Sequence, residues 1–67
     1  MKIFSERLKI LRKEKNLSQR DVANALGIHH SGYGKFEIDG ETNFEMLVKI
    51  AKFFGVSTDF LLGESEI

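Results

Sequence analysis

The stretch LSQRDVANALGIHHSGYGKFE, residues 17–37, decides the fold of this chain, because two short helical patterns meet in it at Gly27. Apolar residues at helical spacing give each of the two segments one face to bury. These residues are Val22, Ala23 and Leu26 before the glycine, and Ile28, Tyr33 and Phe36 after it. Ser18 is suited to cap the first helix, since its hydroxyl can accept from an unpaired amide of the first turn. Gly27 stands where that helix must end and the backbone needs a positive φ.

The same periodicity predicts five helices and no strands. We expect them at about residues 3–15, 19–26, 29 or 30 to 37, 44–54, and in a short segment that begins after Ser57 or Thr58 and ends at Gly63. The other core candidates are Phe4, Leu8, Leu11, Leu47, Ile50, Ala51, Phe54, Phe60 and Leu61. Residues 38–43, IDGETN, read as a turn in which Asn43 can cap the following helix. The predicted fold class is therefore all-α, a compact five-helix domain over residues 1–63 with a loose C-terminal tail at 64–67.

Composition excludes several classes of protein. At 67 residues we expect one domain with a modest core. The chain has no cysteine and no cluster of metal ligands, so we expect no disulfide, no metal and no cofactor. No apolar run approaches the ~20 residues of a membrane span, and no signal peptide is evident. The lack of cysteine fits a reducing cytoplasm, where we expect the protein to act.

The net charge of zero conceals a polarised chain. Residues 1–20 carry seven basic and two acidic side chains, a net of +5, whereas residues 21–67 carry a net of −5. A phosphate backbone responds to the local field, so the basic end can dock on nucleic acid while the acidic end faces away. The alternative is that the first helix simply has a solvated charged face.

Four segments carry a resemblance to a known family: LKILRKEKNLSQ (8–19), DVANALGI (21–28), KFE (35–37) and LVKIAKFFGVSTDFLLG (47–63). In them the chain resembles the Cro and lambda-repressor type of helix-turn-helix protein, also called the XRE family. The resemblance implies a lambda-repressor-like DNA-binding domain of a bacterial or phage transcriptional regulator, whose partner is double-stranded DNA. It also implies that the second helix of residues 17–37 enters the major groove.

The resemblance implies two sets of DNA contacts. The base-reading positions are His29, His30, Ser31 and Lys35, and the backbone contacts are Ser18, Gln19 and Arg20. Histidine and lysine can donate to guanine N7 or O6, and serine can donate or accept. In the family, the residue at Gln19 bonds a phosphate and braces the recognition helix, which suits an amide with both donors and an acceptor. For the histidine pair the alternative is an exposed turn without a ligand. A metal site is a poorer interpretation, since no third ligand is evident.

Two glycines and an acidic turn depart from the pattern of the family. Gly32 and Gly34 together weaken a short helix by about 2 kcal/mol relative to alanine. They indicate either close approach to DNA, or a helix that orders only on the duplex, or weakened binding. The turn at 38–43 contains Asp39 and Glu41, where relatives usually have a basic residue and a proline.

Structural roles are also implied by the resemblance. Arg12 and Glu37 are expected to form an ion pair that ties the first helix to the end of the third, and loss of one partner would cost about 3–5 kcal/mol in a dry site. Relatives commonly dimerise near the last helix, so that two recognition helices meet major grooves ~34 Å apart. The candidate face of a homodimer here is Phe53, Phe60 and Leu62.

The same residues bear on three classes of function. The leading hypothesis is a sequence-specific regulator, a small repressor that occupies an operator as a dimer. The second is a protein-interaction module on the same scaffold, which binds another regulator or a toxin. An ordered third helix with His30, Ser31 and Lys35 outward beside Gln19 favours DNA, whereas an unravelled one favours a protein partner. We expect no enzyme, because no acid pair or nucleophile–base set falls at useful spacing.

Overall fold

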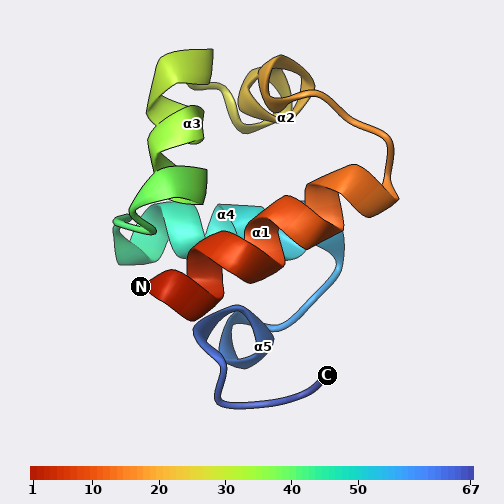
Figure 1. The fold of residues 1–67 in the computed structure, drawn as a ribbon, viewed down its shortest axis with the longest axis vertical. Coiled ribbons are helices and arrows are strands. Elements are labelled where there is room, and N and C mark those ends of the chain that lie inside the picture. Colours follow the sequence, from red (N-terminus) through yellow and green to blue (C-terminus); the bar gives the residue numbers. More distant parts are fainter.

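The computed structural model describes all 67 residues, which form five α-helices and no strands. The helices are α1 (Lys2–Glu14), α2 (Gln19–Leu26), α3 (His30–Ile38), α4 (Phe44–Phe54) and α5 (Thr58–Leu62). In Figure 1, α2 and α3 form one end of the molecule and α5 closes the other. Between these ends α1 packs on α3 and α5, and α4 packs on α2 and α5. The all-α, five-helix prediction is confirmed, with the bounds of α1 and α3 displaced by one residue.

Side-chain caps and one glycine set the ends of the helices in residues 17–37. Ser18 and Asp21 form a capping box, in which the Ser18 hydroxyl accepts from the Asp21 amide at 2.9 Å and the Asp21 carboxylate accepts from the Ser18 amide at 2.9 Å. Gly27 has a φ of 75°, and the Ile28 amide beyond it donates to the Ala23 carbonyl at 3.0 Å. This left-handed glycine ends α2 and turns the chain into α3 within three residues.

The remaining caps follow the expected chemistry. The Asn43 side chain accepts from the Met46 amide at 2.8 Å at the start of α4. Of the two candidates for α5, Ser57 is the cap, since its hydroxyl accepts from the Phe60 amide at 2.9 Å.

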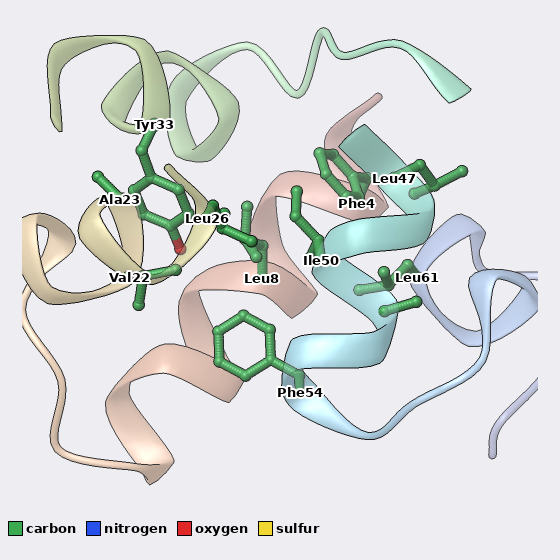
Figure 2. Packing of buried hydrophobic residues seen from close by; sticks show 11 residues of the cluster. Phe4, Leu8, Val22, Ala23, Leu26, Tyr33, Leu47, Ile50, Phe54 and Leu61 are labelled. Atoms are coloured by element: carbon green, nitrogen blue, oxygen red, sulfur yellow. The ribbon is translucent and has the colours of Figure 1, made fainter. Parts of the chain in front are cut away.

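The core is formed by eleven buried apolar side chains drawn from all five helices (Figure 2). They are Phe4, Leu8, Val22, Ala23, Leu26, Tyr33, Leu47, Ile50, Ala51, Phe54 and Leu61. Leu11, Ile28 and Phe36, which we expected on buried faces, are partly buried against this cluster. The periodicity of the sequence therefore identified the core well, because each helix buries a single stripe.

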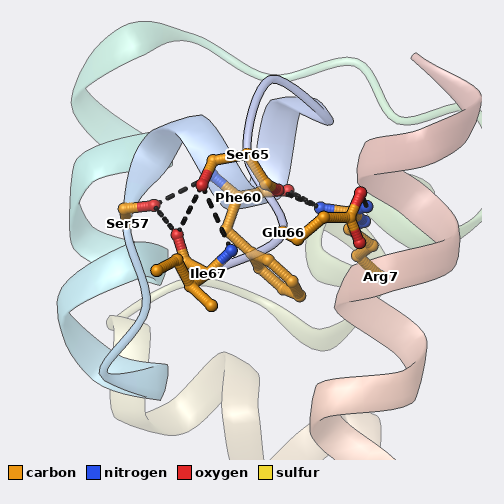
Figure 3. Close-up of polar contacts among 6 residues, drawn as sticks. All are labelled: Arg7, Ser57, Phe60, Ser65, Glu66 and Ile67. Atoms are coloured by element: carbon orange, nitrogen blue, oxygen red, sulfur yellow. Dashed lines mark hydrogen bonds and ion pairs between the residues drawn. The ribbon is translucent and has the colours of Figure 1, made fainter.

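The prediction that Phe60 joins the core is wrong. Leu61 takes the core position of α5, and successive residues on a helix point about 100° apart, so Phe60 faces α1 instead. There the guanidinium of Arg7 lies 4.3 Å from the centre of the Phe60 ring. Arg7 also donates to the carbonyls of Phe60 and, at 2.8 Å, Ser65 (Figure 3). Arg7 therefore ties α1 to α5 and to the segment that follows.

Residues 64–67 lie back against α5. The Ser57 hydroxyl donates to the Ile67 carbonyl at 3.0 Å, and Glu66 pairs with Arg7 at 3.4 Å (Figure 3). None of the five helices is both long and apolar enough to cross a bilayer.

Candidate nucleic-acid interface

The recognition helix expected from the sequence is α3, which is continuous from His30 to Ile38. Gly32 and Gly34 both lie inside it without a positive φ, so neither breaks the helix. The buried side of α3 carries Tyr33 and Glu37. Of the predicted base-reading residues, His29, Ser31 and Lys35 are exposed and His30 is half-buried. The four therefore lie on the solvent side of a continuous helix or at its N-cap.

His29 acts as the N-cap of α3. Its Nδ1 accepts from the Ser31 amide at 3.2 Å and lies 2.7 Å from the Ser31 hydroxyl. Because Nδ1 accepts a hydrogen bond, the proton of the neutral ring lies on Nε2. Only Nε2 of His29 is then left to contact a ligand.

His30 lies beside Arg20 of α2. The Nη2 atom of Arg20 is 3.4 Å from Nε2 of His30. Partial loss of water lowers the pKa of His30, and the charge of Arg20 and the neighbouring His29 lower it further. In the neutral ring of His30, Nδ1–H is a free donor when Nε2 accepts from Arg20.

The N-terminus of α2 presents unpaired amides next to this edge. The Asp21 amide is satisfied by the Ser18 hydroxyl, which leaves the first-turn amides of Gln19 and Arg20 without intrahelical partners. Amides at a helix N-terminus, together with a cationic side chain, favour an anion such as a phosphate. The predicted backbone contacts Ser18, Gln19 and Arg20 thus lie together at one helix end.

A buried polar cluster joins α1, α2 and α3 behind the exposed edge. Arg12 donates to both carboxylate oxygens of Glu37, from Nε at 2.7 Å and from Nη2 at 3.1 Å. Its third donor, Nη1, bonds the Leu17 carbonyl at 2.8 Å, directly before the cap of α2. Gln19 Nε2 donates to Glu37 Oε1 at 3.2 Å. Because one carboxylate receives donors from α1 and α2, it fixes how α2 and α3 sit on α1.

The electrostatics keep this cluster ionised. The side chains of Arg12 and Glu37 are 12% and 1% exposed. Burial by itself would raise the pKa of Glu37, but the hydrogen bonds from Arg12, the nearby Tyr33 hydroxyl, the hydrogen bond from Gln19 and the charge of Arg12 outweigh it and leave that pKa below its usual value. The same hydrogen bond raises the pKa of Arg12. Burial, and then the Glu37 carboxylate, raise the pKa of Tyr33, whose buried hydroxyl is close enough to Glu37 to affect its pKa but has no hydrogen bond of standard geometry.

One contact at this end of the molecule could not be anticipated from the sequence. Lys49 of α4 donates from Nζ to the Leu26 carbonyl at 2.9 Å. A cation at the C-terminus of α2 offsets the partial negative charge of the last carbonyls. The contact joins residues 23 positions apart, so no local pattern could have predicted it.

The three residues of the candidate dimer face, Phe53, Phe60 and Leu62, do not share one exposed surface. Phe53 is 36% exposed on α4, whereas Leu62 is partly buried against the core and Phe60 lies against Arg7. Elsewhere the most exposed large apolar side chains outside the C-terminal residue are Ile38 and Phe44, at 82% and 77%.

Comparison with known proteins gives consistent matches. A family model described as Helix-turn-helix matches residues 8–61. The chain is 49% identical over 61 residues to the SPbeta prophage-derived uncharacterized HTH-type transcriptional regulator YonR of Bacillus subtilis, covering 90% of this chain and 56% of YonR. It is 35% identical over 65 residues to the cryptic phage CTXphi transcriptional repressor RstR of Vibrio cholerae, covering 96% and 59%.

A third relative is named as an activator, whereas RstR is named as a repressor. The chain is 40% identical over 65 residues to the HTH-type transcriptional activator BcrR of Enterococcus faecalis, covering 96% of this chain and 32% of BcrR. The chain thus spans little more than half the length of YonR, at 56%, and less of BcrR. No solved structure gives a significant match. The family match over residues 8–61 agrees with the α2–Gly27–α3 geometry, and the chain therefore belongs to the XRE-type helix-turn-helix family of DNA-binding transcriptional regulators.

Proposed function

We propose that this chain is the DNA-binding part of a small repressor, which occupies an operator as a dimer and blocks transcription by steric occupancy. One observation carries the proposal: α3 is an ordered helix whose polar edge, including Ser31 and Lys35, lies outward beside the N-terminus of α2. Repression is supported by the relative RstR, named as a phage repressor, and by the prophage origin of YonR.

In this proposal α3 lies in the major groove. Lys35 donates to guanine, Ser31 donates or accepts, and the neutral His30 donates from Nδ1. His29 has only Nε2 available, because its Nδ1 caps α3. Each productive base contact contributes about 1–3 kcal/mol of discrimination against the wrong base.

Backbone contacts position the helix in the groove. The Gln19 and Arg20 amides and the Arg20 guanidinium receive a phosphate at the start of α2. The Ser18 hydroxyl already accepts from Asp21 and retains its own proton to donate. The net charge of +5 over residues 1–20 favours this side of the molecule for DNA, whereas Asp39 and Glu41 disfavour a phosphate contact from the turn after α3.

The experiment is selection of bound duplexes from a random DNA pool at two salt concentrations. We expect an enriched palindrome with half-sites about one helical turn apart, and affinity that falls with salt in proportion to the number of phosphates contacted. Lys35→Ala should lose roughly 5- to 100-fold in affinity for the selected site and relax its sequence at one position. Gln19→Ala should weaken binding to all DNA sequences by a similar factor. The matched control is Lys52→Ala, which removes the same charge from an exposed position on α4.

The selection also separates the alternatives. A pool without enrichment would refute the repressor and favour a protein partner such as another regulator or a toxin.

The dimer has its own test, since Phe53 offers the exposed apolar contact on the candidate face. Sedimentation of the protein–DNA complex should show two copies per site, and Phe53→Asp should reduce this to one. A single half-site occupied by one copy would refute the dimer.

A further inference from the structure

The side chain of Gln19 crosses from α2 to α3 and lies between Glu37 and Gly34. Its Nε2 donates to Glu37 Oε1 at 3.2 Å. Its other end, Oε1, lies 3.3 Å from the place that a Cβ atom at position 34 would occupy. The amide therefore rests against the backbone of α3 at a position without a side chain.

Charge fixes the orientation of this amide. The carboxylate of Glu37 is an acceptor only, so the NH₂ group of Gln19 must face it and the carbonyl oxygen must face Gly34. The NH₂ group has two donors, and Glu37 takes one of them. The second N–H has no hydrogen-bond partner in the protein, and Gln19 is exposed, so a ligand can reach it.

The backbone of α3 does not explain the glycine at position 34. Gly34 lies inside the helix and has no positive φ, so any residue could adopt its conformation and most would favour the helix more. A methyl group there would meet the Gln19 oxygen at 3.3 Å, at the tight edge of van der Waals contact, and a longer side chain would extend further over the amide. Gly32, two residues earlier in the same helix, has nothing within 4 Å of its missing Cβ. Gln19 is therefore the neighbour that distinguishes the surroundings of Gly34 from those of Gly32.

We propose that Gly34 is a positioning residue for DNA recognition, because the space that it leaves keeps the Gln19 amide bonded to Glu37. The docked amide joins the first residue of α2 to the last turn of α3 and holds its second N–H ready for a phosphate. A side chain at position 34 crowds the amide and weakens its bond to Glu37, whereas Arg12 continues to join Glu37 to the Leu17 carbonyl before α2. The DNA consequence rests on the proposed function, whereas the docking of the amide does not.

The first arm of the test needs no DNA. The side-chain NH₂ resonances of Gln19 are assigned in the folded protein by their loss in Gln19→Ala. In wild type they should show the shift and slow exchange of a carboxylate-bonded amide. Gly34→Leu should move them to the position of a solvent-exposed glutamine, and Gly34→Ala, whose methyl group lies 3.3 Å from the Gln19 oxygen, should move them part of the way. Gly32→Ala and Gly32→Leu should leave them unchanged. Unmoved Gln19 resonances in Gly34→Leu would overturn the proposal.

The second arm measures affinity for the selected operator in a double-mutant cycle. Gly34→Ala should weaken binding about fivefold in the wild-type background and leave it unchanged in the Gln19→Ala background, a coupling within the range found between contacting residues. Gly32→Ala should show no coupling to Gln19. An equal loss in both backgrounds, or no loss in either, would show that Gly34 does not act through Gln19. If wild type binds no sequence, the repressor proposal fails, and the resonance arm alone decides the docking of the amide.

Discussion

Replacing Arg12 with methionine should strongly destabilise the domain, because it leaves the Glu37 carboxylate buried without its cation. The Glu37 side chain is 1% exposed, and only Gln19 would still donate to it. Removal of one partner from a buried ion pair costs about 3–5 kcal/mol. A domain of 67 residues has a total stability of roughly 3–10 kcal/mol at 0.05–0.15 kcal/mol per residue. A loss of this size is about a third or more of that stability, so at the lower end of the range Arg12→Met should be at least half unfolded at pH 7.

The loss of stability in Arg12→Met should also depend on pH, whereas the loss from a simple packing defect would not. In wild type the pKa of Glu37 is below its unfolded value of 4.5, so its contribution is present above that pH and is lost as the pH falls through the folded pKa. In Arg12→Met, burial without a cation raises the folded pKa above the unfolded one. The folded variant then binds the proton more tightly, so acidification from pH 7 towards about 5 should stabilise it relative to wild type.

Urea denaturation at a series of pH values measures both effects. Lys13→Met removes a positive charge from an exposed position on the same helix, and it should change the free energy of unfolding by less than about 0.5 kcal/mol. Arg12→Met combined with Glu37→Met should recover most of the loss, because no unpaired charge remains. A loss below about 1 kcal/mol in Arg12→Met, or a stability gap from wild type that does not narrow on acidification, would refute this account of the cluster.

Three smaller changes in stability are also expected. Gly32→Ala should raise the free energy of unfolding by about 1 kcal/mol in thermal denaturation, since alanine favours the helix and meets no atom within 4 Å; a loss would contradict the helical conformation at that position. Tyr33→Phe should stabilise the domain by about 1 kcal/mol in urea, because it removes a buried hydroxyl without a partner. Destabilisation would instead indicate that the hydroxyl donates to Glu37. Ser18→Ala should cost about 1 kcal/mol by opening the capping box, as judged by helical circular dichroism during melting, and an unchanged midpoint would argue against that cap.

Local signals in the sequence are sufficient to predict the helices and most of the core. Ser18, Gly27 and Asn43 act on backbone groups within three or four residues, so their roles as caps could be predicted from neighbours alone. The buried stripes of α2 and α4 follow from helical spacing in the same way. Phe60 marks the limit of this reasoning, because in a helix of five residues the periodicity does not decide which of two adjacent apolar side chains faces the core.

The order and ends of the helices, and most of the residues that they bury, follow from local sequence patterns, and the resemblance to a family adds the edge of α3 that faces outward. Which distant groups meet depends instead on the angles between packed helices, as in the contacts of Lys49 with Leu26, of Arg7 with Phe60, and of Gln19 with the backbone at Gly34. Those angles arise from the core and the buried cluster as a whole, and no short window of residues contains them.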